Sequence, residues 1–359
     1  MRLIQIAYRD YRNIEEALLV PDPGITLLCG DNGQGKTNLL EGIYFFASGR
    51  SFRTVHDAEL IRNGCRYAEL SLLCESLSGQ LSMTVLWDNV TQKRFFKRGG
   101  VPLTLLSEMI GSFRAVLFCP QHLSLVCDGP GARRSFLDVA LSQSDAGYLA
   151  SLRRYNRILS QRNALIRLCR EKHDSKPFAD TAPLWSEQLA KEAAYLAEKR
   201  VRYVERLNGC ASAFVRDMTG GTENASFSYR TPRTEEEYFR LLTENAETEL
   251  RAGSTLYGIH KDDVTILLSD KEARSFASRG QQRSLALAMK LAEGELSKED
   301  TGEYPVFLFD DVLSELDEKR RVFLLSGIRD KQVIMTSCEA GQDPSVAGKC
   351  CRILGGRIL

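Results

Sequence analysis

The chain has 359 residues, of which 43% are hydrophobic and 26% are charged, and its 48 lysines and arginines nearly balance its 47 aspartates and glutamates. This composition is typical of a soluble globular protein with a large core, and the length suggests two domains. No apolar segment approaches the roughly 18 residues of a membrane-spanning helix, and charged residues interrupt the apolar residues of the N-terminus, so we expect a cytoplasmic protein without a signal peptide.

The cysteines and histidines favour a reducing compartment and disfavour a structural metal site. None of the ten cysteines belongs to a CxxC pair, and several lie in apolar strand-like segments, where a free thiol packs as a small hydrophobic group. Cys350 and Cys351 could form a reactive or metal-binding pair, although a surface tail is the simpler interpretation. The four histidines lack metal-site spacing. With a net charge of +1, any nucleic-acid contact must come from local patches.

The first 120 residues are expected to form mainly β-strands. Short apolar segments of β-type composition occupy residues 3–6, 25–29, 70–74 and 81–87. A hairpin is predicted next, because basic residues on both sides of Phe95 and Phe96 precede a turn signal at Gly99 and Gly100.

A glycine-rich loop follows the second of these strands and matches the pattern G-x-x-x-x-G-K-[ST] in full. Its residues are Gly30, Asp31, Asn32, Gly33, Gln34, Gly35, Lys36 and Thr37, and we add the neighbouring Asn38. Such a loop points backbone N–H groups at phosphate oxygens, with its lysine on the β- and γ-phosphates and its threonine hydroxyl on Mg²⁺. The alternative is a chance glycine turn. The strand before it and the helical spacing of apolar residues after it favour an ATP site.

From about residue 133 the pattern changes to long helices. Apolar residues follow three-and-four spacing over residues 148–169 and again over 185–207. Residues 173–183 contain Pro177 and Pro183 and are expected to connect these helices in a hairpin. Each arm would have roughly 25 to 30 residues and a length of about 40 Å. This is a short arm, not a long coiled coil.

The α/β pattern returns in the last third of the chain. A strand is expected near residues 225–229, and strands and helices alternate from Val264 to the end. The simplest interpretation is one α/β domain, residues 1–120 and 252–359, that is split by an inserted, mainly helical domain at residues 121–251.

An apolar strand at residues 306–309 ends in Asp310 and Asp311. Carboxylates at the carboxyl end of a strand lie at the sheet edge where ligands bind in α/β folds. We expect Asp310 on the Mg²⁺ side of the site and Asp311 to orient or deprotonate the attacking water, with Lys36 as its catalytic partner. An acidic pair alone is more often a helix cap, but the phosphate loop favours the catalytic assignment.

A further helix start precedes this strand. Its residues are Ser278, Arg279, Gly280 and Gln281, and apolar residues at helical spacing follow them. A serine and a glycine at a helix start present a hydroxyl and free N–H groups to an anion, although an isolated example is usually an ordinary cap.

The combination of these motifs with Ser314 to Asp317 resembles the ABC-type ATPase heads of the SMC group. The resemblance implies a P-loop ATPase head with an inserted helical domain, in which residues 278–281 are the signature motif. It also implies that Ser314 and Asp317 belong to a loop that crosses a dimer interface. Two such heads enclose ATP, so that Ser278 and Gly280 of one copy complete the phosphate loop of the other.

Additional segments narrow this resemblance to the RecF family. They are residues 10–13, 33–41, 49–54, 133–138, 155–157, 161–163 and 280–283. The resemblance covers nearly the whole chain. It implies an ATP- and Mg²⁺-dependent homodimer that binds single-stranded DNA and gapped or junction duplexes, and that acts with RecO and RecR to load RecA.

The resemblance also assigns roles to other residues. Arg53 is expected near the γ-phosphate or the DNA, with a plain surface arginine as the alternative, and Gln121 near the metal, the water and the inserted domain. Asp311 stands where most ABC heads have glutamate, and Thr336 with Ser337 where transporters usually have histidine. A shorter carboxylate and no histidine suggest slow hydrolysis suited to a switch. Arg279 and the segment around His260 depart from the family pattern without losing polar or basic character.

Two basic patches are candidates for DNA contact. The first predicted arm helix contains Arg153, Arg154, Arg157, Arg162, Arg167, Arg170 and Lys172, and the predicted hairpin contains Lys93, Arg94, Lys97 and Arg98. Within them we select Arg153, Arg154, Arg157, Lys93 and Arg94. Local excess charge neutralises phosphates even in a nearly neutral protein, while solvated surface charge is the alternative.

Two other functions remain open at this point. An ABC transport subunit would share the phosphate loop and the signature, but it normally has only a small insertion between them. A non-catalytic, ATP-gated DNA clamp would bind nucleotide with hydrolysis incidental.

Overall fold

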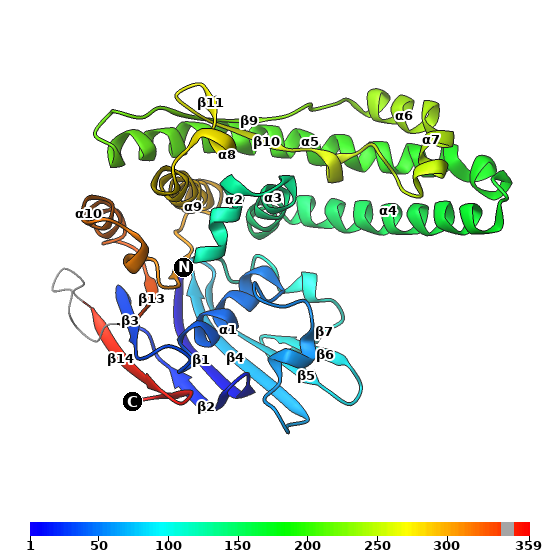
Figure 1. The fold of residues 1–359 in the computed structure, drawn as a ribbon. Helices are drawn as coiled ribbons and strands as arrows, with labels where there is room; N and C mark the ends of the chain where they lie inside the picture. Colours follow the sequence, from blue (N-terminus) through cyan, green and yellow to red (C-terminus); the bar gives the residue numbers. More distant parts are fainter. Residues whose placement is uncertain (339–347) are drawn as a thin grey trace. The chain divides into compact units, whose positions relative to one another are not determined.

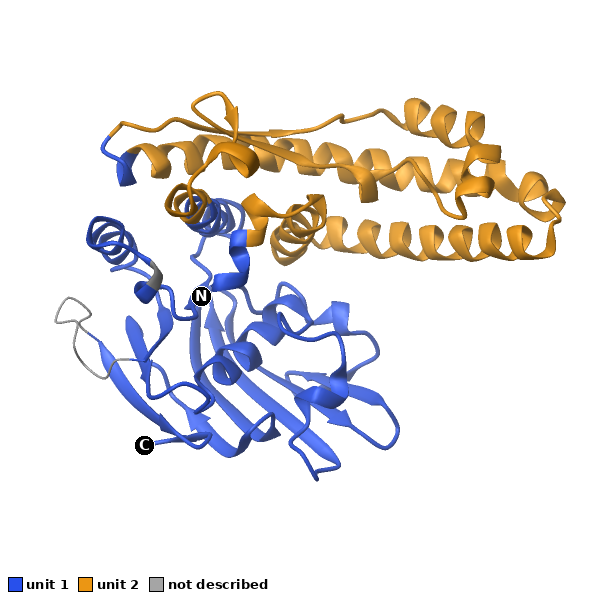
Figure 2. Cartoon of the chain, in the orientation of Figure 1, with its two compact units in different colours: residues 1–123, 217–220, 286–359 blue, residues 124–216, 221–285 orange. Residues whose placement is uncertain are grey.

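The computed structural model describes residues 1–338 and 348–359. Their contacts divide the chain into two compact units, which Figure 2 colours separately. The first comprises residues 1–123, 217–220 and 286–359, and the second comprises residues 124–216 and 221–285. No helix among the described residues is long and apolar enough to cross a membrane.

A six-stranded antiparallel sheet forms one layer of the first unit, in the order β2-β1-β4-β5-β6-β7 (Figure 1). Its strands are β1 (Arg2–Tyr11), β2 (Ile14–Leu19), β4 (Tyr67–Ser76), β5 (Gly79–Asp88), β6 (Lys93–Arg98) and β7 (Val101–Leu103). In β4 a buried residue alternates with a more exposed one, as expected for a strand with one face on the core. The predicted basic hairpin is confirmed, because β6 pairs antiparallel with β7.

A second six-stranded sheet carries the parallel strands, in the order β15-β14-β3-β13-β12-β8. Its strands are β3 (Ile25–Cys29), β8 (Ala115–Phe118), β12 (Val306–Phe309), β13 (Val333–Ser337), β14 (Lys349–Leu354) and β15 (Arg357–Ile358). Every residue of β8 and β12 is buried, which is typical of parallel strands covered on both faces. Strands β3, β12 and β13 all point the same way, so their carboxyl ends share one edge of the sheet.

Helix α1 (Lys36–Ser48) lies in the core of this unit. Each of its residues from Leu39 to Ala47 is buried, and α1 contacts β4 of the antiparallel sheet as well as β8 and β13 of the parallel sheet. Tyr8 of β1 donates its hydroxyl to the carbonyl of Leu39 over 2.6 Å, and Phe45 stacks edge-on against Trp87 with ring centroids 4.8 Å apart. A helix buried on all sides holds the loop before it in a fixed position.

Short 3₁₀ segments and two further helices complete the first unit. They are η1 (Asp57–Leu60), η2 (Leu106–Glu108), η3 (Pro120–Leu123), η5 (Leu313–Glu315), α9 (Arg279–Thr301) and α10 (Glu318–Gly327). Helix α9 begins in the second unit and continues in the first, since the boundary falls between Leu285 and Ala286.

The second unit is mainly helical, as its sequence predicted. Its elements are α2 (Ser124–Cys127), α3 (Pro130–Ser144), α4 (Ala146–Lys172), α5 (Lys176–Met218), β9 (Ala225–Tyr229), α6 (Glu235–Glu244), α7 (Ala246–Ala252), η4 (Ile259–Lys261), β10 (Val264–Leu268), β11 (Lys271–Glu272) and α8 (Ala273–Phe276). Strand β10 pairs with both β9 and β11 in a small antiparallel sheet. This pairing places residues 252–285, which we expected in the ATPase head, among the contacts of the second unit.

The arm of the second unit differs from the prediction in its turn and in one length. Helix α4 has 27 residues, but α5 has 43 and begins at Lys176, so residues 173–183 do not form an extended connection. Pro177 lies in the first turn of α5, where its missing N–H has no helical partner to lose, and Pro183 lies inside the helix. At 1.5 Å per residue, α5 spans about 65 Å.

Candidate nucleotide-binding site

The glycine-rich loop joins β3 to α1 at the carboxyl edge of the parallel sheet. Gly33 and Gly35 have φ angles of 78° and 109°, a left-handed range that favours glycine. Gly35 is the N-cap of α1, and a side chain there would collide with Asn13. The ammonium of Lys36 donates to the carbonyls of Gly30 and Asp31, the latter over 2.9 Å. The loop therefore forms a cradle around one buried cation.

Strand β12, which is followed by Asp310 and Asp311, ends at the same edge of the parallel sheet. The hydroxyl of Thr37 donates to Oδ1 of Asp310 over 2.9 Å, which joins the first turn of α1 to the end of β12. Burial raises the pKa of the Asp310 carboxyl above its ordinary value, whereas hydrogen bonds from Thr37 and Thr336 oppose this shift. The two residues that the sequence assigned to Mg²⁺ are thus in direct contact, although 273 positions separate them.

The donors present here fit a magnesium ion. Mg²⁺ prefers oxygen ligands and usually binds through one or two carboxylates, with water and substrate phosphates completing its shell. A threonine hydroxyl and the Asp310 carboxylate provide this partial set. Within residues 1–338 and 348–359 no group of three or more His, Cys, Asp or Glu side chains could hold a metal unaided.

Asp311 has an unusual backbone conformation beside this pair. Its φ is 53°, which is uncommon for a residue other than glycine. Its N–H donates to the hydroxyl of Thr336 over 2.8 Å, and that hydroxyl donates to Asp310 over 2.9 Å. Thr336 at the end of β13 therefore connects the two carboxylate residues. The sequence draws attention to Thr336 only because transporters usually have histidine at this position. Nothing in the sequence indicates that its hydroxyl accepts from Asp311 and donates to Asp310.

The turn between β1 and β2 supports the start of α1. Arg12 makes two hydrogen bonds to the fully buried Glu41 of α1, of 2.9 and 2.7 Å. Asn13 accepts from Asn38 over 2.7 Å, and Asn38 in turn accepts from Arg53 over 2.6 Å. This network places Arg53 beside the phosphate loop. Burial still raises the pKa of Asp310, and the charge of Arg53 is one of the smaller effects that oppose this rise.

A cysteine that was not predicted as a site residue also lies at the glycine-rich loop. The exposed thiol of Cys338, directly after β13, is 3.7 Å from Nζ of Lys36 and donates to Asn32 over 2.9 Å.

Gln121, by contrast, was expected near the metal. It lies exposed in η3, just after β8 at the same sheet edge. No hydrogen bond joins its side chain to the loop in the described part of the chain.

The proposed signature motif forms a capped helix start in the second unit. Ser278 and Gln281 cap α9 reciprocally: the Ser278 N–H donates to Oε1 of Gln281 over 2.7 Å, and the Gln281 N–H donates to the serine hydroxyl over 3.3 Å. Ser278 and Arg279 are exposed, and Gly280 is partly exposed. The start of α9 is therefore open to a ligand or a second molecule.

The comparisons with known proteins identify the family. Residues 2–346 match the family model described as the RecF/RecN/SMC N terminal domain. A curated relative, the DNA replication and repair protein RecF of Clostridium novyi, is 37% identical over 91% of this chain and 90% of its own length. The chain belongs to the RecF family. The RecF of Staphylococcus carnosus is 36% identical over the full length of both chains.

A solved structure agrees with this assignment over the whole fold. It is a structure of the recombination mediator protein RecF with ATP, in the RecFOR pathway, and it has a TM-score of 0.91 and 31% identity while covering 99% of this chain and 96% of that one. The expected fold, an ABC-type, SMC-like ATPase head with a mainly helical insertion, is confirmed. The transport-subunit alternative has no support among these relatives.

The loop expected to cross the dimer interface in RecF-family heads follows Asp311. The hydroxyl of Ser314 donates to the carbonyl of Asp311 over 2.8 Å. Asp317 is the N-cap of α10, where its carboxylate accepts from the N–H of Arg320 over 2.9 Å and lies against the Arg320 guanidinium. Backbone hydrogen bonding lowers the pKa of Asp317. The two residues therefore hold the local shape of the loop.

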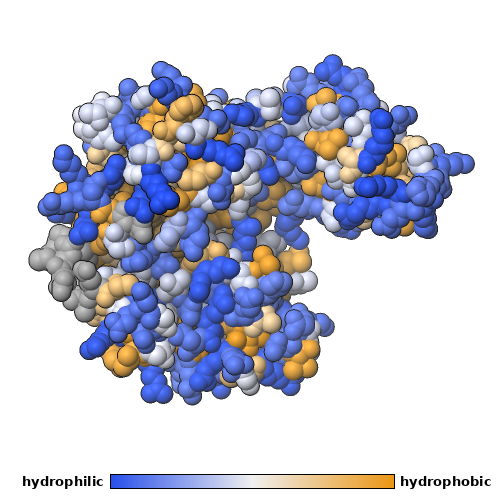
Figure 3. Space-filling model, in the orientation of Figure 1, coloured by the Kyte–Doolittle hydropathy of each residue, from blue (hydrophilic) through white to orange (hydrophobic). Residues whose placement is uncertain are grey.

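The candidate DNA-binding residues are not all free in this RecF-family chain. Arg94 forms a two-pronged ion pair with Asp57, and Arg154 pairs with Glu192 of α5 over 2.5 Å. Arg162 is fully buried against Glu249, so it does not belong to an exposed basic patch. Lys93, Arg153 and Arg157 are exposed. Figure 3 shows a mostly hydrophilic face on the arm, with smaller apolar areas between the polar ones.

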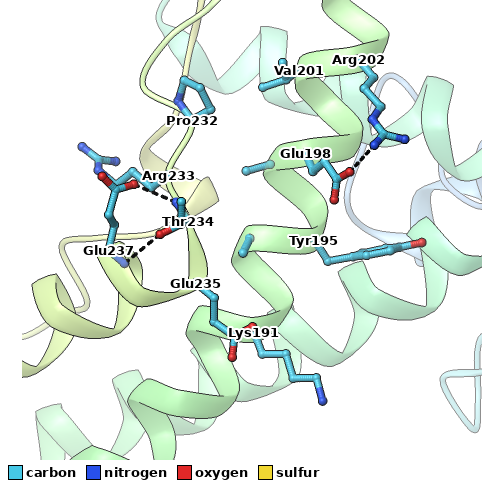
Figure 4. Close-up of a pocket in the computed structure, with 12 residues that line it drawn as sticks. Lys191, Tyr195, Glu198, Val201, Arg202, Pro232, Arg233, Thr234, Glu235 and Glu237 are labelled. Atoms are coloured by element: carbon cyan, nitrogen blue, oxygen red, sulfur yellow. Dashed lines mark hydrogen bonds and ion pairs between the residues drawn. The ribbon is translucent and has the colours of Figure 1, made fainter.

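An open groove of about 760 Å³ lies elsewhere in the second unit, between α5 and the start of α6 (Figure 4). Its basic and acidic side chains are equal in number. They are Lys191, Arg202 and Arg233 against Glu198, Glu235 and Glu237. Glu237 belongs to the capping box of α6, and Glu198 pairs with Arg202. This groove has no charge excess to attract a phosphate, and it contains none of the predicted site residues.

Proposed function

We propose that this chain is an ATP-dependent DNA-binding protein of recombinational repair and replication restart. The observation that carries the proposal is the 2.9 Å hydrogen bond between Thr37 and Asp310, since it unites the phosphate loop with the acidic strand at one sheet edge. The related RecF, solved with ATP and 31% identical to this chain, supports the same nucleotide here.

The nucleotide would bind with its phosphates in the cradle of residues 30–38. Lys36 exchanges its contacts with Gly30 and Asp31 for the β- and γ-phosphates, and the loop N–H groups orient the chain of phosphates. Mg²⁺, held by Thr37 and Asp310, would neutralise phosphate charge. Asp311 would orient the attacking water, and the hydrogen bonds of Thr336 keep Asp311 beside Asp310.

The site would be completed in trans by a second copy. Ser278 and Gly280 lie at an exposed helix start whose N–H groups suit a γ-phosphate, and Ser314 with Asp317 would form part of the interface. Arg279 at the second signature position adds a positive charge there. This arrangement requires an ATP-bound homodimer. Its ATP turnover would be slow because the Asp311 carboxylate is short.

The dimer would bind single-stranded DNA and gapped or junction duplexes. Arg153 and Arg157 on α4 and Lys93 on β6 are exposed, while Arg94 and Arg154 would need to leave their acidic partners. The related RecF is a recombination mediator in the RecFOR pathway, which supports RecR and RecO as partners here and RecA as the downstream protein.

Binding of a labelled gapped duplex with and without ATP tests the proposal. We expect ATP to tighten binding at least tenfold in the wild type and not in Lys36→Ala, which loses the phosphate contact. Asp311→Asn should retain ATP-dependent binding but lose turnover. DNA affinity that ignores ATP in all three proteins would overturn the proposal.

One alternative has a specific observation in its favour. Asp311 is a short carboxylate whose backbone N–H is held by Thr336. Thr336 and Ser337 also stand where transporters usually have histidine, and both features also suit a non-catalytic, ATP-gated DNA clamp. Wild-type turnover at saturating gapped DNA separates the two. Hydrolysis no faster than that of Asp311→Asn would favour the clamp.

A further inference from the structure

The C-terminal hairpin of β14 and β15 is attached to the phosphate loop at two points. At the start, Gly30 lies so close to β14 that a side-chain carbon there would collide with the carbonyl of Ile353. In the middle of the loop, the N–H groups of Gly355 and Gly356 donate to the side-chain and main-chain oxygens of Gln34, over 2.7 and 2.9 Å. A displacement of β14 is therefore transmitted to the loop.

Two cysteines meet at this attachment. Cys29 is the last residue of β3, directly before Gly30, and its sulfur is 3.0 Å from that of Cys350 on the neighbouring β14. In the parallel pairing Cys350 lies opposite Leu27, two residues from Cys29, so both cysteines point to the same face of the sheet. Cys351 pairs with Leu28 and is buried on the opposite face. The adjacent cysteines 350 and 351 therefore do not face each other.

The two thiols also differ in access. Cys350 is exposed and Cys29 is buried. An oxidant in solution would reach Cys350 first, and Cys29 would be held in place to react with the product. Disulfides in reducing compartments are typically transient and redox-sensing, and this arrangement of an accessible and a resolving thiol suits such a role.

We infer that Cys29 and Cys350 are a reversible redox pair that couples thiol oxidation to nucleotide binding. With a peroxide as oxidant, the Cys350 thiol is converted to a sulfenic acid with release of water. The Cys29 thiol then attacks that sulfur, the S–O bond breaks, the S–S bond forms and a second water leaves. A dithiol reductant reverses the reaction, since it reduces the disulfide to two thiols and is itself oxidised to a disulfide.

Closing the pair draws β14 and β3 together. A disulfide has a sulfur separation of about 2.0 Å, so the strands shift relative to the open pair and the hydrogen bonds from Gly355 and Gly356 to Gln34 are displaced. The coupling rests on the proposed ATP site, and we expect oxidation to weaken nucleotide binding.

The test treats the full chain with hydrogen peroxide, blocks the remaining thiols with N-ethylmaleimide and maps linked peptides by mass spectrometry. In parallel, the affinity for a fluorescent ATP analogue is measured before oxidation, after it, and after dithiothreitol. The variant Cys350→Ser changes an exposed position, and Cys210→Ser on α5 is the matched control that keeps the pair.

We expect a peptide linking Cys29 to Cys350 in the wild type and in Cys210→Ser, with affinity at least threefold weaker and restored by dithiothreitol. Cys350→Ser should show neither change. Absence of the linked peptide, an unchanged affinity when it forms, or an equal loss in Cys350→Ser would overturn the inference. The last result would instead assign the effect to another thiol, such as Cys338 beside Lys36. A reduced protein that does not bind the analogue would contradict the proposed function, while the peptide map would still report on the pair.

Discussion

At the scale of single residues, the Thr336 hydroxyl links the most important groups of the site. It donates to Asp310 and accepts from the N–H of Asp311, so one side chain fixes both acidic residues. Lys36, Thr37, Asp310 and Asp311 could be predicted from the sequence because their motifs have fixed spacing. Thr336 and Cys338 could not, because their roles arise only when β13 pairs with β3 and β12.

Replacing Thr336 with valine should therefore impair hydrolysis more than folding. The change keeps the side-chain shape but removes a hydrogen bond to a charged group, which contributes about 1.5–3 kcal/mol. We expect ATP turnover to fall by about tenfold or more, and Thr336→Ser, which keeps the hydroxyl, to retain most of it. Steady-state ATPase rates for the two variants provide the measurement. Equal rates in both would show that the hydroxyl is not needed.

His260 predicts a pH dependence of stability. The carbonyl of Thr255 can only accept, so Nε2 carries the proton and Nδ1 accepts from Tyr155 over 2.6 Å. Burial lowers the pKa of His260 to about 4 from 6.5. The unfolded chain gains a proton as the pH falls below about 6.5 and the folded chain does not until about 4, so stability is lost across this window, by about 2 kcal/mol between pH 7 and pH 5.

Urea unfolding of the wild type and of His260→Gln at pH 7 and pH 5 measures this contribution. The glutamine variant cannot titrate, and its free energy of unfolding should fall less between the two pH values. Equal losses in both proteins would contradict the assignment of the effect to His260.

At the scale of elements, the arm shows what the periodicity of apolar residues predicts and what it does not. Apolar spacing predicted two long helices, and both exist. The turn was misplaced because Pro177 lies in the first turn of α5, where a proline does not end a helix, and because Pro183 is accommodated inside α5. Charge counting along α4 also failed for Arg162, because its acidic partner Glu249 comes from α7, far along the chain.

Arg162 should accordingly stabilise the fold. Its guanidinium contacts the carboxylate of Glu249 and the hydroxyl of Thr255, all buried. Arg162→Met leaves the carboxylate buried without its cation and should destabilise the chain by about 3–5 kcal/mol. The double variant Arg162→Met with Glu249→Leu should recover part of that loss. Denaturant unfolding of both provides the test, and a double variant less stable than the single one would refute this role.

The exposed face of α4 makes a separate prediction about DNA. Replacing Arg153 and Arg157 together with glutamate should weaken binding of a gapped duplex at least tenfold and make the dependence of affinity on salt shallower, since fewer phosphates are neutralised. Arg202→Glu, on α5 and similarly exposed, serves as the control. Fluorescence anisotropy over a range of salt concentrations measures both quantities. An equal effect in the control would indicate nonspecific charge, not a binding track.

At the scale of the whole molecule, the two parts of the proposed nucleotide site belong to different compact units of the chain. Residues 30–38 with Asp310 and Asp311 lie in the first compact unit, and residues 278–281 lie in the second. The discontinuous α/β domain was predictable because strands β3 and β12 have strong apolar patterns on both sides of the helical insertion. The exact unit boundary was not, because it depends on the pairing of β9 with β10.

Our central claim is that ATP is enclosed by two copies, each giving Lys36 to one site and Ser278 to the other. Mixing Lys36→Ala protein with Ser278→Arg protein tests it most directly, because only a heterodimer contains one intact site. Each variant alone should be inactive, and an equal mixture should recover up to about one quarter of wild-type ATP turnover. A mixture as inactive as its components, or a Ser278→Arg protein that hydrolyses ATP normally by itself, would contradict the claim.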